Sequence, residues 1–304
     1  MSVIDRDDTP RKDTRLLTDG EIERAIAGIG TGLEMDGVRF TTAAEAAARS
    51  VITGEGGADE PVTCRSVGSN GRHKVHAVNQ YPRTKANRKL LGHNISHIPE
   101  RSIDTILAKR MAELTSNPIK GRFNFTHMQA IHKYLFHDLY EWAGNLRITD
   151  ARPCFHGVLY VPPTTIPEEL LRAFNDINSG VYLNHHTREH FVRDLSRHWG
   201  DLTTIRPFRG GNAATQMVFF DHLAGAVGWA VEWRMVNTPA AQAASHFAYV
   251  DGGKTLADIL RPAINLASQT PPESTATHET ALAPDHHWEA MIKHHDTMPE
   301  QPYI

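Results

Sequence analysis

Cysteine is scarce in this chain, with only Cys64 and Cys154 among 304 residues. Two cysteines cannot build a disulfide scaffold or a cysteine-rich zinc site. No apolar run approaches the ~18 residues that a membrane helix needs, and the first residues lack the apolar core of a signal peptide. A formal net charge of -3 also lacks the basic excess of nucleic-acid binders. We therefore expect a cytoplasmic protein with no nucleic-acid or membrane partner, while delivery by a secretion system stays open.

Histidine, by contrast, is abundant, with 19 copies in a chain of otherwise ordinary globular composition. The pairs His93 with His97 and His186 with His190 have the four-residue spacing that can place two metal ligands on one helix face. No carboxylate motif accompanies either pair. We therefore predict hydrogen-bonded or solvated histidines and no metal site.

Most of the chain has a helical pattern of apolar residues. Thr18 and Glu21 have the spacing of a capping box, and apolar residues then recur at steps of three and four. A second short helix is expected after Thr41 or Thr42. Further helices are predicted to begin near Pro99, Thr126, Pro167 and Thr187, followed by a buried helix around Phe219, and the helix capped by Thr126 should run to Gly144.

One segment has the composition of a β-hairpin. Residues 145–163, NLRITDARPCFHGVLYVPP, are rich in β-branched and aromatic side chains and carry a turn signal at His156-Gly157. Only this strand pair is expected against about seven helices, so the predicted fold class is mostly α. The residues after 266 are rich in Pro, Ser and Thr and are predicted to be disordered.

The loop RPFRGGN lies between two predicted helices, at residues 206–212. Glycines before a helix let the backbone approach a ligand, and the free N–H groups of the first helical turn can bind an anion. A plain tight turn with Asn212 as the helix cap is the alternative. On the loop alone the plain turn is favoured, because short glycine loops have low specificity.

Four stretches together resemble the Fic (fido) family. They are NQYPRTKANRKLLG, FNFTHMQAIHKYLFHDLYEWAGNLRI, RPCFHGVLYVPP and LSRHWGDLTTIRPFRGGNAATQMVFFDHLA, within residues 80–265. The resemblance implies the Fic helical fold with a small β-hairpin flap. It also implies transfer of AMP from ATP, with Mg²⁺, to a hydroxyl of a protein. In such a flap, Phe155, His156, Gly157 and Val158 would bind the partner as an added strand.

The family signature H-P-F-x-[D/E]-G-N-G-R-x-x-R is only partly present. Pro207, Phe208, Gly211 and Asn212 match it. The resemblance therefore implies that Phe208, Arg209, Gly211 and Asn212 form the anion- or nucleotide-binding loop.

The positions that carry the family's chemistry differ. Arg206 stands where the family has its general-base histidine, and Gly210 stands where it has the acid that holds Mg²⁺. Ala213 and Ala214 replace the glycine and first arginine that line the phosphate site. Met217 replaces the last arginine, which orients the γ-phosphate.

These replacements remove the requirements of the transfer reaction. Arg206 stays protonated, with a pKa of about 12.5 or above, and cannot accept a proton near neutral pH. Loss of a general base costs about 10²–10⁴-fold, and Mg²⁺ usually needs one or two carboxylates. We therefore predict a pseudoenzyme or binding module, and binding of ATP and Mg²⁺ becomes doubtful.

Two alternatives stay open. The same pocket could run altered chemistry on another transferred group or a small molecule, with His198, eight residues before Arg206, as a substitute base. The chain could also be the eroded half of a toxin, with no present function.

The N-terminal residues 20–60 resemble the small antitoxin module that inhibits some Fic proteins. Its motif is [S/T]-x-x-x-E-[G/N], and here Gly32 stands at the Ser/Thr position and Asp36-Gly37 at the acid-Gly pair. In the family this acid pairs with the last signature arginine, which is Met217 here. We therefore predict that the inhibitory segment now serves as structural cover. The predicted division is an antitoxin-like segment 1–60 (1–18 loose), a linker 61–79, a Fic domain 80–265 and a tail 266–304.

Overall fold

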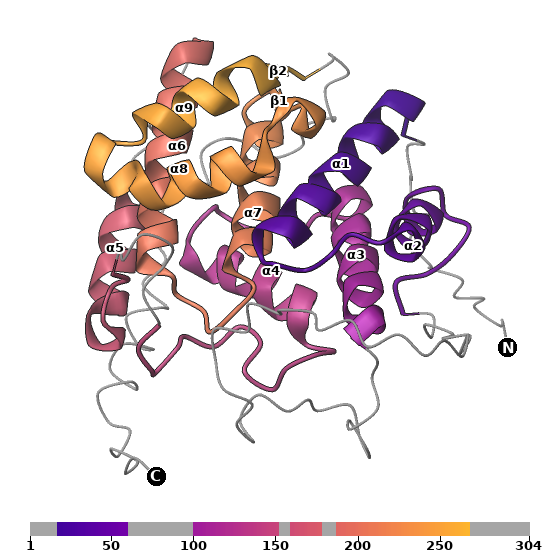
Figure 1. Ribbon diagram of the computed structural model, residues 1–304, viewed down its shortest axis with the longest axis horizontal. Helices are drawn as coiled ribbons and strands as arrows, with labels where there is room; N and C mark the ends of the chain where they lie inside the picture. The colour runs from indigo at the N-terminus through magenta and orange to yellow at the C-terminus, as the bar shows by residue number, and fades with distance from the viewer. Residues whose placement is uncertain (1–16, 60–99, 152–158, 178–186, 268–304) are drawn as a thin grey trace, which may run out of the picture.

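The computed structural model describes residues 17–59, 100–151, 159–177 and 187–267, and in these ranges helices dominate (Figure 1). This confirms the predicted mostly α fold class. The α-helices are α1 Asp19–Met35, α2 Thr42–Ile52, α3 Glu100–Ser116, α4 Phe125–Phe136, α5 Ile166–Asp176, α6 Arg188–Ile205, α7 Asn212–Ala226, α8 Thr238–Asp251 and α9 Lys254–Leu260. Three short 3-10 helices, η4 Pro163–Thr165, η6 Trp233–Met235 and η7 Arg261–Ala263, complete the helical elements of this part.

Side-chain caps start several helices where the sequence predicts them. Thr18 and Glu21 form the capping box of α1, and the Thr41 and Thr187 side chains accept backbone N–H groups at the starts of α2 and α6. The predicted cap Thr126 is wrong. Asn124 caps α4 by accepting the backbone N–H of His127, and the helix ends at Phe136, well before Gly144.

The two strands of the described residues lie late in the chain. β1, Trp229–Val231, pairs antiparallel with β2, Ile264–Leu266, and Trp229 lies opposite Leu266. The turn of the predicted hairpin falls at 152–158, outside the described residues. Next to it, Leu146 forms an isolated antiparallel bridge with Phe208 of the loop.

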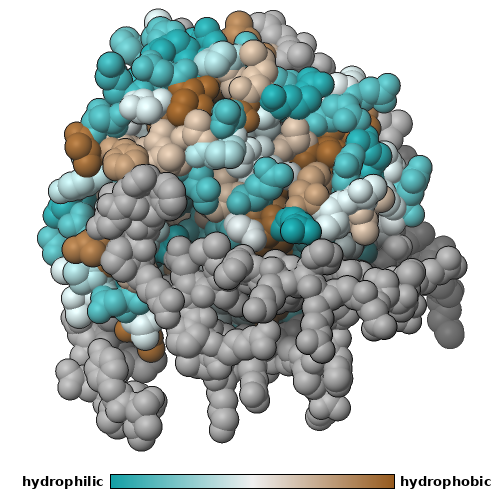
Figure 2. Space-filling model, viewed as in Figure 1, coloured by the Kyte–Doolittle hydropathy of each residue, from teal (hydrophilic) through white to brown (hydrophobic). Residues whose placement is uncertain are grey.

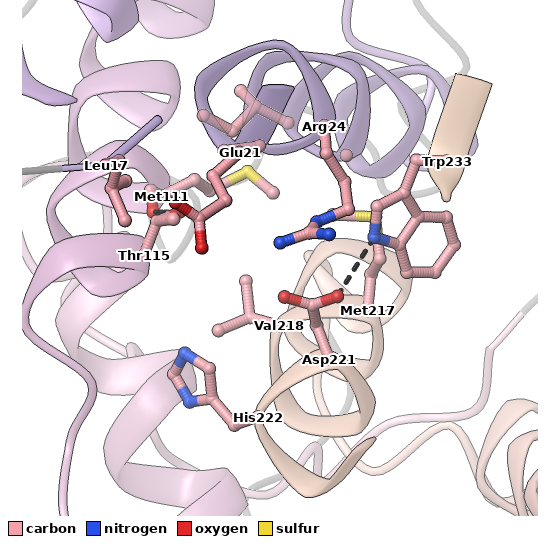
Figure 3. A pocket seen from close by; sticks show the side chains of 13 residues that line it. Leu17, Glu21, Arg24, Met111, Thr115, Met217, Val218, Asp221, His222 and Trp233 are labelled. Atoms are coloured by element: carbon pink, nitrogen blue, oxygen red, sulfur yellow. Dashed lines mark hydrogen bonds between the residues drawn. The ribbon is translucent and has the colours of Figure 1, made fainter. Parts of the chain in front are cut away.

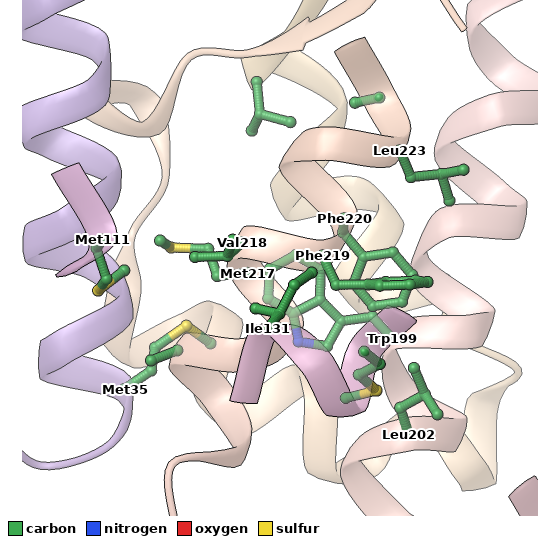
Figure 4. Packing of buried hydrophobic residues seen from close by; sticks show 14 of the residues in the cluster. Met35, Met111, Ile131, Trp199, Leu202, Met217, Val218, Phe219, Phe220 and Leu223 are labelled. Atoms are coloured by element: carbon green, nitrogen blue, oxygen red, sulfur yellow. The ribbon is translucent and has the colours of Figure 1, made fainter. Parts of the chain in front are cut away.

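Helix α7 is the centre of the core. Its side chains Phe219 and Phe220 are fully buried, and Trp199 of α6 stacks on Phe220 with ring centroids 5.3 Å apart (Figure 4). A helix that is apolar on all sides must be covered on all sides. Helices α1, α4 and α6 supply that cover.

The N-terminal helices share this core with the rest of the protein. α1 packs against α3, α7 and α8, and α2 packs along α3. On the face shown in Figure 2, hydrophilic residues predominate, and apolar residues form separate patches. The helix pair α1–α2 is thus a structural part of one hydrophobic core, and it brings the end of α1 to the start of α7.

Candidate functional site: the α6–α7 loop and its cover

The loop between α6 and α7 is fixed by two residues with a left-handed backbone. Arg206 ends α6 with φ +46°, and Gly211 precedes α7 with φ +70°. A Cβ at position 211 would lie 2.2 Å from Cζ of Phe136, so only glycine fits there. Asn212 is not the helix cap. Its Oδ1 accepts the N–H of Phe208 at 2.9 Å and its Nδ2 donates to the Phe208 carbonyl at 2.8 Å, which closes the loop.

A buried histidine, His132 of α4, packs against the loop and forms a hydrogen bond with it. The ring of His132 stacks on Phe208 with centroids 3.9 Å apart. Its Nδ1 accepts the N–H of Gly144 at 2.8 Å, and its Nε2 donates to the Gly210 carbonyl at 3.0 Å. Burial lowers the pKa of His132 to about 3, so the ring is neutral at pH 7. No sequence spacing indicates this role, because the partners of His132 lie 12 and 78 residues away.

Arg147 ties the loop to the chain on both sides of residues 152–158. Its Nε donates to the Arg206 carbonyl at 2.7 Å, and its Nη2 donates to the Ile205 carbonyl at 3.2 Å. It also donates to the carbonyls of Thr149 and Val161. Because the side chain is buried and planar, it holds these segments in one arrangement.

Arg206 lies over an aromatic ring. Its guanidinium carbon is 4.8 Å from the ring centroid of Tyr160. The Tyr160 hydroxyl donates to Nε2 of His246 at 3.1 Å, and His246 Nδ1 donates to the Gln242 carbonyl at 2.8 Å. Burial, opposed by the Gln242 carbonyl and assisted by the charge of Arg206, lowers the pKa of His246. His246 is therefore a neutral histidine whose Nε2 accepts a hydrogen bond, and the ring of Tyr160 lies between it and Arg206.

His198 makes its described contacts elsewhere. Its Nε2 lies 3.2 Å from Nη2 of Arg197, and its Nδ1 lies 3.9 Å from the Asp201 carboxylate. Burial, with the charge of Arg197, lowers its pKa to about 4. These contacts give no support to the predicted role of His198 as a substitute base beside Arg206.

The carboxylate of Asp36 occupies the start of α7. Its Oδ2 accepts the N–H of Ala214 at 2.8 Å, and its Oδ1 accepts the N–H of Ala213 at 3.2 Å. Burial raises the pKa of Asp36, while the two N–H groups and the charge of Arg206 act in the opposite direction. Gly37, with φ +74°, then turns the chain away. The anion cradle expected from the sequence thus holds an anion supplied by the chain itself.

Two of the residues that depart from the family pattern touch each other. A Cβ at Gly32 would lie 2.8 Å from Cε of Met217 and 2.9 Å from Cε of Met111. Met217 is only 3% exposed. Position 217 is therefore part of the packing between α1 and α7.

The predicted flap residues Phe155, His156, Gly157 and Val158 lie outside the described residues. Two of the described residues near them are apolar and exposed. Ile148 is 76% exposed and Leu159 is 71% exposed.

Comparison with known proteins identifies the domain that carries this loop. A family model described as Fic/DOC family matches residues 122–224. These residues form a Fic/DOC-family domain. The expected region 80–265 contains this match and extends beyond it on both sides.

Curated relatives of the Fic domain carry the name of protein adenylyltransferases. The chain is 27% identical over 193 residues to the probable protein adenylyltransferase Fic of Salmonella typhimurium, covering 62% of this chain and 93% of that protein. It is 28% identical over 180 residues to protein adenylyltransferase VbhT of Bartonella schoenbuchensis, covering 59% of this chain but 37% of that protein.

Solved structures share the fold. The N-terminal Fic domain of a putative cell filamentation protein from Bartonella quintana, solved with bound ADP, has a TM-score of 0.53 at 21% identity, covering 60% of this chain and 94% of that one. BepC from Bartonella tribocorum, solved with bound AMPPNP, has a TM-score of 0.51 at 20% identity, covering 55% of this chain and 87% of that one. In the described part of this chain, no helix combines the length and apolar character that crossing a bilayer requires.

Proposed function

We propose that this Fic-domain protein lacks ordinary AMP-transfer activity and acts as a binding module. The observation that carries the proposal is the Asp36 carboxylate on the N–H groups of Ala213 and Ala214. A phosphate that used these N–H groups would have to displace a carboxylate already bound there.

The side chains around the loop support the same conclusion. Arg206 cannot accept a proton near neutral pH, and it is held over the ring of Tyr160. Gly210 offers no carboxylate to a metal ion, and Met217 packs on α1. Base, metal ligand and phosphate-orienting cation are thus all replaced by groups with structural partners.

We further propose that the antitoxin-like segment is a permanent cover of the loop. Its helix α1 approaches α7 through Gly32 and Met217, a contact made of small and apolar groups. Such packing does not respond to a nucleotide as an ion pair with an arginine would. The segment would then stabilise the fold instead of regulating transfer.

The proposed ligand is a protein partner that adds a strand at the flap. The exposed Ile148 and Leu159 offer apolar surface on both sides of residues 152–158, and strand addition uses main-chain hydrogen bonds with side-chain pockets for specificity. Arg147 would connect such binding to the loop, because it contacts the carbonyls of Val161 and Arg206.

Nucleotide transfer assays test the proposal directly. The chain would be incubated with labelled ATP, UTP, GTP or CDP-choline, with Mg²⁺ and a cell lysate, beside a Fic protein of demonstrated activity. We expect no labelled protein from this chain by autoradiography or mass spectrometry. Robust labelling by the wild type that is lost in Asn212→Ala would overturn the proposal.

A second candidate function rests on the Tyr160–His246 hydrogen bond. In an enzyme with altered chemistry, Arg206 would stabilise negative charge and His246 would serve as the base, acting through the Tyr160 hydroxyl. If the assays reveal a transferred group, His246→Gln and Tyr160→Phe should abolish transfer, and His198→Gln should leave it intact. Loss of transfer in His198→Gln, with transfer retained in the other two variants, would instead assign the role of base to His198.

For localisation we propose the cytoplasm. The competing expectation comes from structural neighbours, since the Bartonella quintana protein is named a VirB-translocated Bep effector protein. Fractionation of cells and culture medium with a tagged chain separates the two, and accumulation in the medium without lysis would contradict the cytoplasmic assignment.

A further inference from the structure

A second polar site lies away from the loop, in a cavity of about 200 Å³ between α1, α3 and α7 (Figure 3). Trp233 of η6 closes one side of it. The residues that argue for a ligand are the apolar side chains Ile29, Met111, Met217 and Val218 and the charged side chains Arg24 and Asp221. This volume equals about seven waters at ~30 Å³ each, which is room for a small organic ligand.

The charged pair comes from two different helices. Arg24 reaches in from α1 and Asp221 from α7. Asp221 Oδ1 accepts the indole N–H of Trp233 at 3.1 Å. Burial raises the pKa of Asp221, although the indole and the charge of Arg24 act to lower it. Arg24 forms no hydrogen bond and no ion pair within 4 Å with any residue that the structure describes.

The remaining polar side chains of the cavity form hydrogen bonds, although Nδ1 of His222 has no partner among the described residues. Glu21 accepts the backbone N–H and the hydroxyl of Thr18 in the capping box of α1. His222 donates from Nε2 to the Leu114 carbonyl at 3.1 Å, and burial lowers its pKa, which keeps the ring neutral. The unsatisfied pattern is therefore one carboxylate, one guanidinium and the accepting Nδ1 of His222 beside an apolar wall.

We propose that this cavity binds a small apolar zwitterion, namely a free amino acid with an aliphatic or thioether side chain. Its ammonium would lie at the Asp221 carboxylate, its carboxylate at the Arg24 guanidinium, and its side chain against Met111 and Met217. This assignment is independent of the function proposed for the loop.

Charge complementarity selects the zwitterion over simpler ligands. An amine without a carboxylate would satisfy Asp221 but meet the charge of Arg24, and a carboxylate without an amine would meet the charge of Asp221. A like charge left close by in a poorly solvated site is costly. Methionine side chains in the wall adapt to irregular apolar shapes, so leucine and methionine are both suitable probes.

Calorimetric titration and thermal shift of the full chain test the assignment. The probes are L-leucine and L-methionine, compared with isoamylamine and 4-methylvalerate, each of which keeps one of the two charges. We expect the amino acids to bind at least tenfold more tightly than either single-charge analogue and to raise the melting temperature increasingly as their concentration exceeds Kd. Equal binding of one analogue, or no binding of either amino acid, would overturn the proposal.

Variants locate the site. Arg24→Gln and Asp221→Asn should each weaken amino-acid binding at least tenfold, and Asn at position 221 can still accept from Trp233. Ala25→Leu should abolish binding by filling the cavity, with no dependence on either charge. The exposed residues Arg172→Gln and Asp258→Asn are the matched controls and should bind like the wild type. Unchanged binding in Ala25→Leu would place the ligand elsewhere and sink the assignment.

Discussion

The two halves of helix α7 meet their neighbours in opposite ways. At the first turn, the N–H groups of Ala213 and Ala214 are matched by the Asp36 carboxylate. Two to three turns further on, Asp221 and Arg24 face a cavity without forming an ion pair. The same partner helix, α1, therefore seals the position where family chemistry is expected and leaves another position open. A Fic-domain loop can thus keep its shape while the first N–H groups of the following helix are bound by a carboxylate of the same chain.

The largest effect is expected at Arg147, and it measures how much the hydrogen bonds of this side chain stabilise the loop. Arg147→Met leaves the carbonyls of Ile205, Arg206, Thr149 and Val161 without their charged donor. We expect a loss of about 3–5 kcal/mol in the free energy of unfolding, measured with urea. The exposed Arg172→Met serves as control and should change stability by less than about 0.5 kcal/mol. A similar small loss in both variants would mean that the stability of the loop does not depend on the hydrogen bonds of Arg147.

Acid should lower the stability of the fold through His132, the buried histidine that supports the loop before α7. Its folded pKa of about 3 lies below the ordinary value of 6.5, so below pH 6.5 the unfolded chain binds a proton that the folded chain does not. Stability therefore falls as pH falls from about 6.5 towards 3, by on the order of 4 kcal/mol in total. Urea titrations across this range should show a shallower pH dependence for His132→Gln than for the wild type. Parallel curves would contradict the buried neutral ring.

Gly211→Ala tests the steric limit of the loop. The added Cβ would meet the Phe136 ring in a backbone conformation that costs L-residues about 1–2 kcal/mol, and overpacking adds about 1–3 kcal/mol. We expect a total loss of about 3 kcal/mol. Gly225→Ala in the same helix is the control, because no heavy atom would lie within 4 Å of its Cβ. Equal stability of the two variants would show that the loop can relax.

Asp36→Ala tests whether the Asp36 carboxylate prevents other anions from binding at the start of α7. Removal of the carboxylate from the start of α7 should cost about 1–2 kcal/mol of stability. It should also let inorganic phosphate or ATP bind at least tenfold more tightly than to the wild type, by calorimetric titration. Glu34→Ala, an exposed acid on the same helix, is the control. Tight phosphate binding by the wild type itself would remove the contrast between the two halves of α7.

The smallest effect on stability is expected at the cavity beside Asp221, in the second half of α7. Ala25→Leu fills the cavity with apolar atoms and should raise the free energy of unfolding by about 1 kcal/mol. Chemical denaturation with and without L-leucine measures both the gain and the loss of ligand stabilisation. A marked loss of stability would show that the cavity cannot accept three further heavy atoms, and therefore cannot accept a small ligand.

Local rules of helix capping allow much of the fold to be predicted. Thr18 caps α1 as predicted, Thr41 is the one of two predicted candidates that caps α2, and α6 begins next to Thr187, where a helix is predicted to begin. At α4, Asn124 and Thr126 both suit a cap, and the asparagine, slightly preferred for this position, takes it. The strands β1 and β2 are three residues each and lie far apart in the chain, so no alternation announces them.

The candidate site was predictable in its loop but not in its contacts. The signature residues locate the turn before α7, and the motif around Asp36 is the basis of the predicted inhibitory segment, which stays a prediction. The destination of the Asp36 carboxylate depends on the packing of Gly32 on Met217, which only the folded core defines. His246 reaches Tyr160 across 86 residues, a separation at which no sequence spacing carries information.

The contact between Gly32 and Met217 also limits how this protein could change. An arginine introduced at position 217 alone would carry a longer, charged side chain into a buried space bordered by the methyl group of Met111 and by α1. A side chain introduced at position 32 alone would collide with Met217. Substitution of either residue alone is therefore unfavourable, and a change at this contact would require replacements in both helices together.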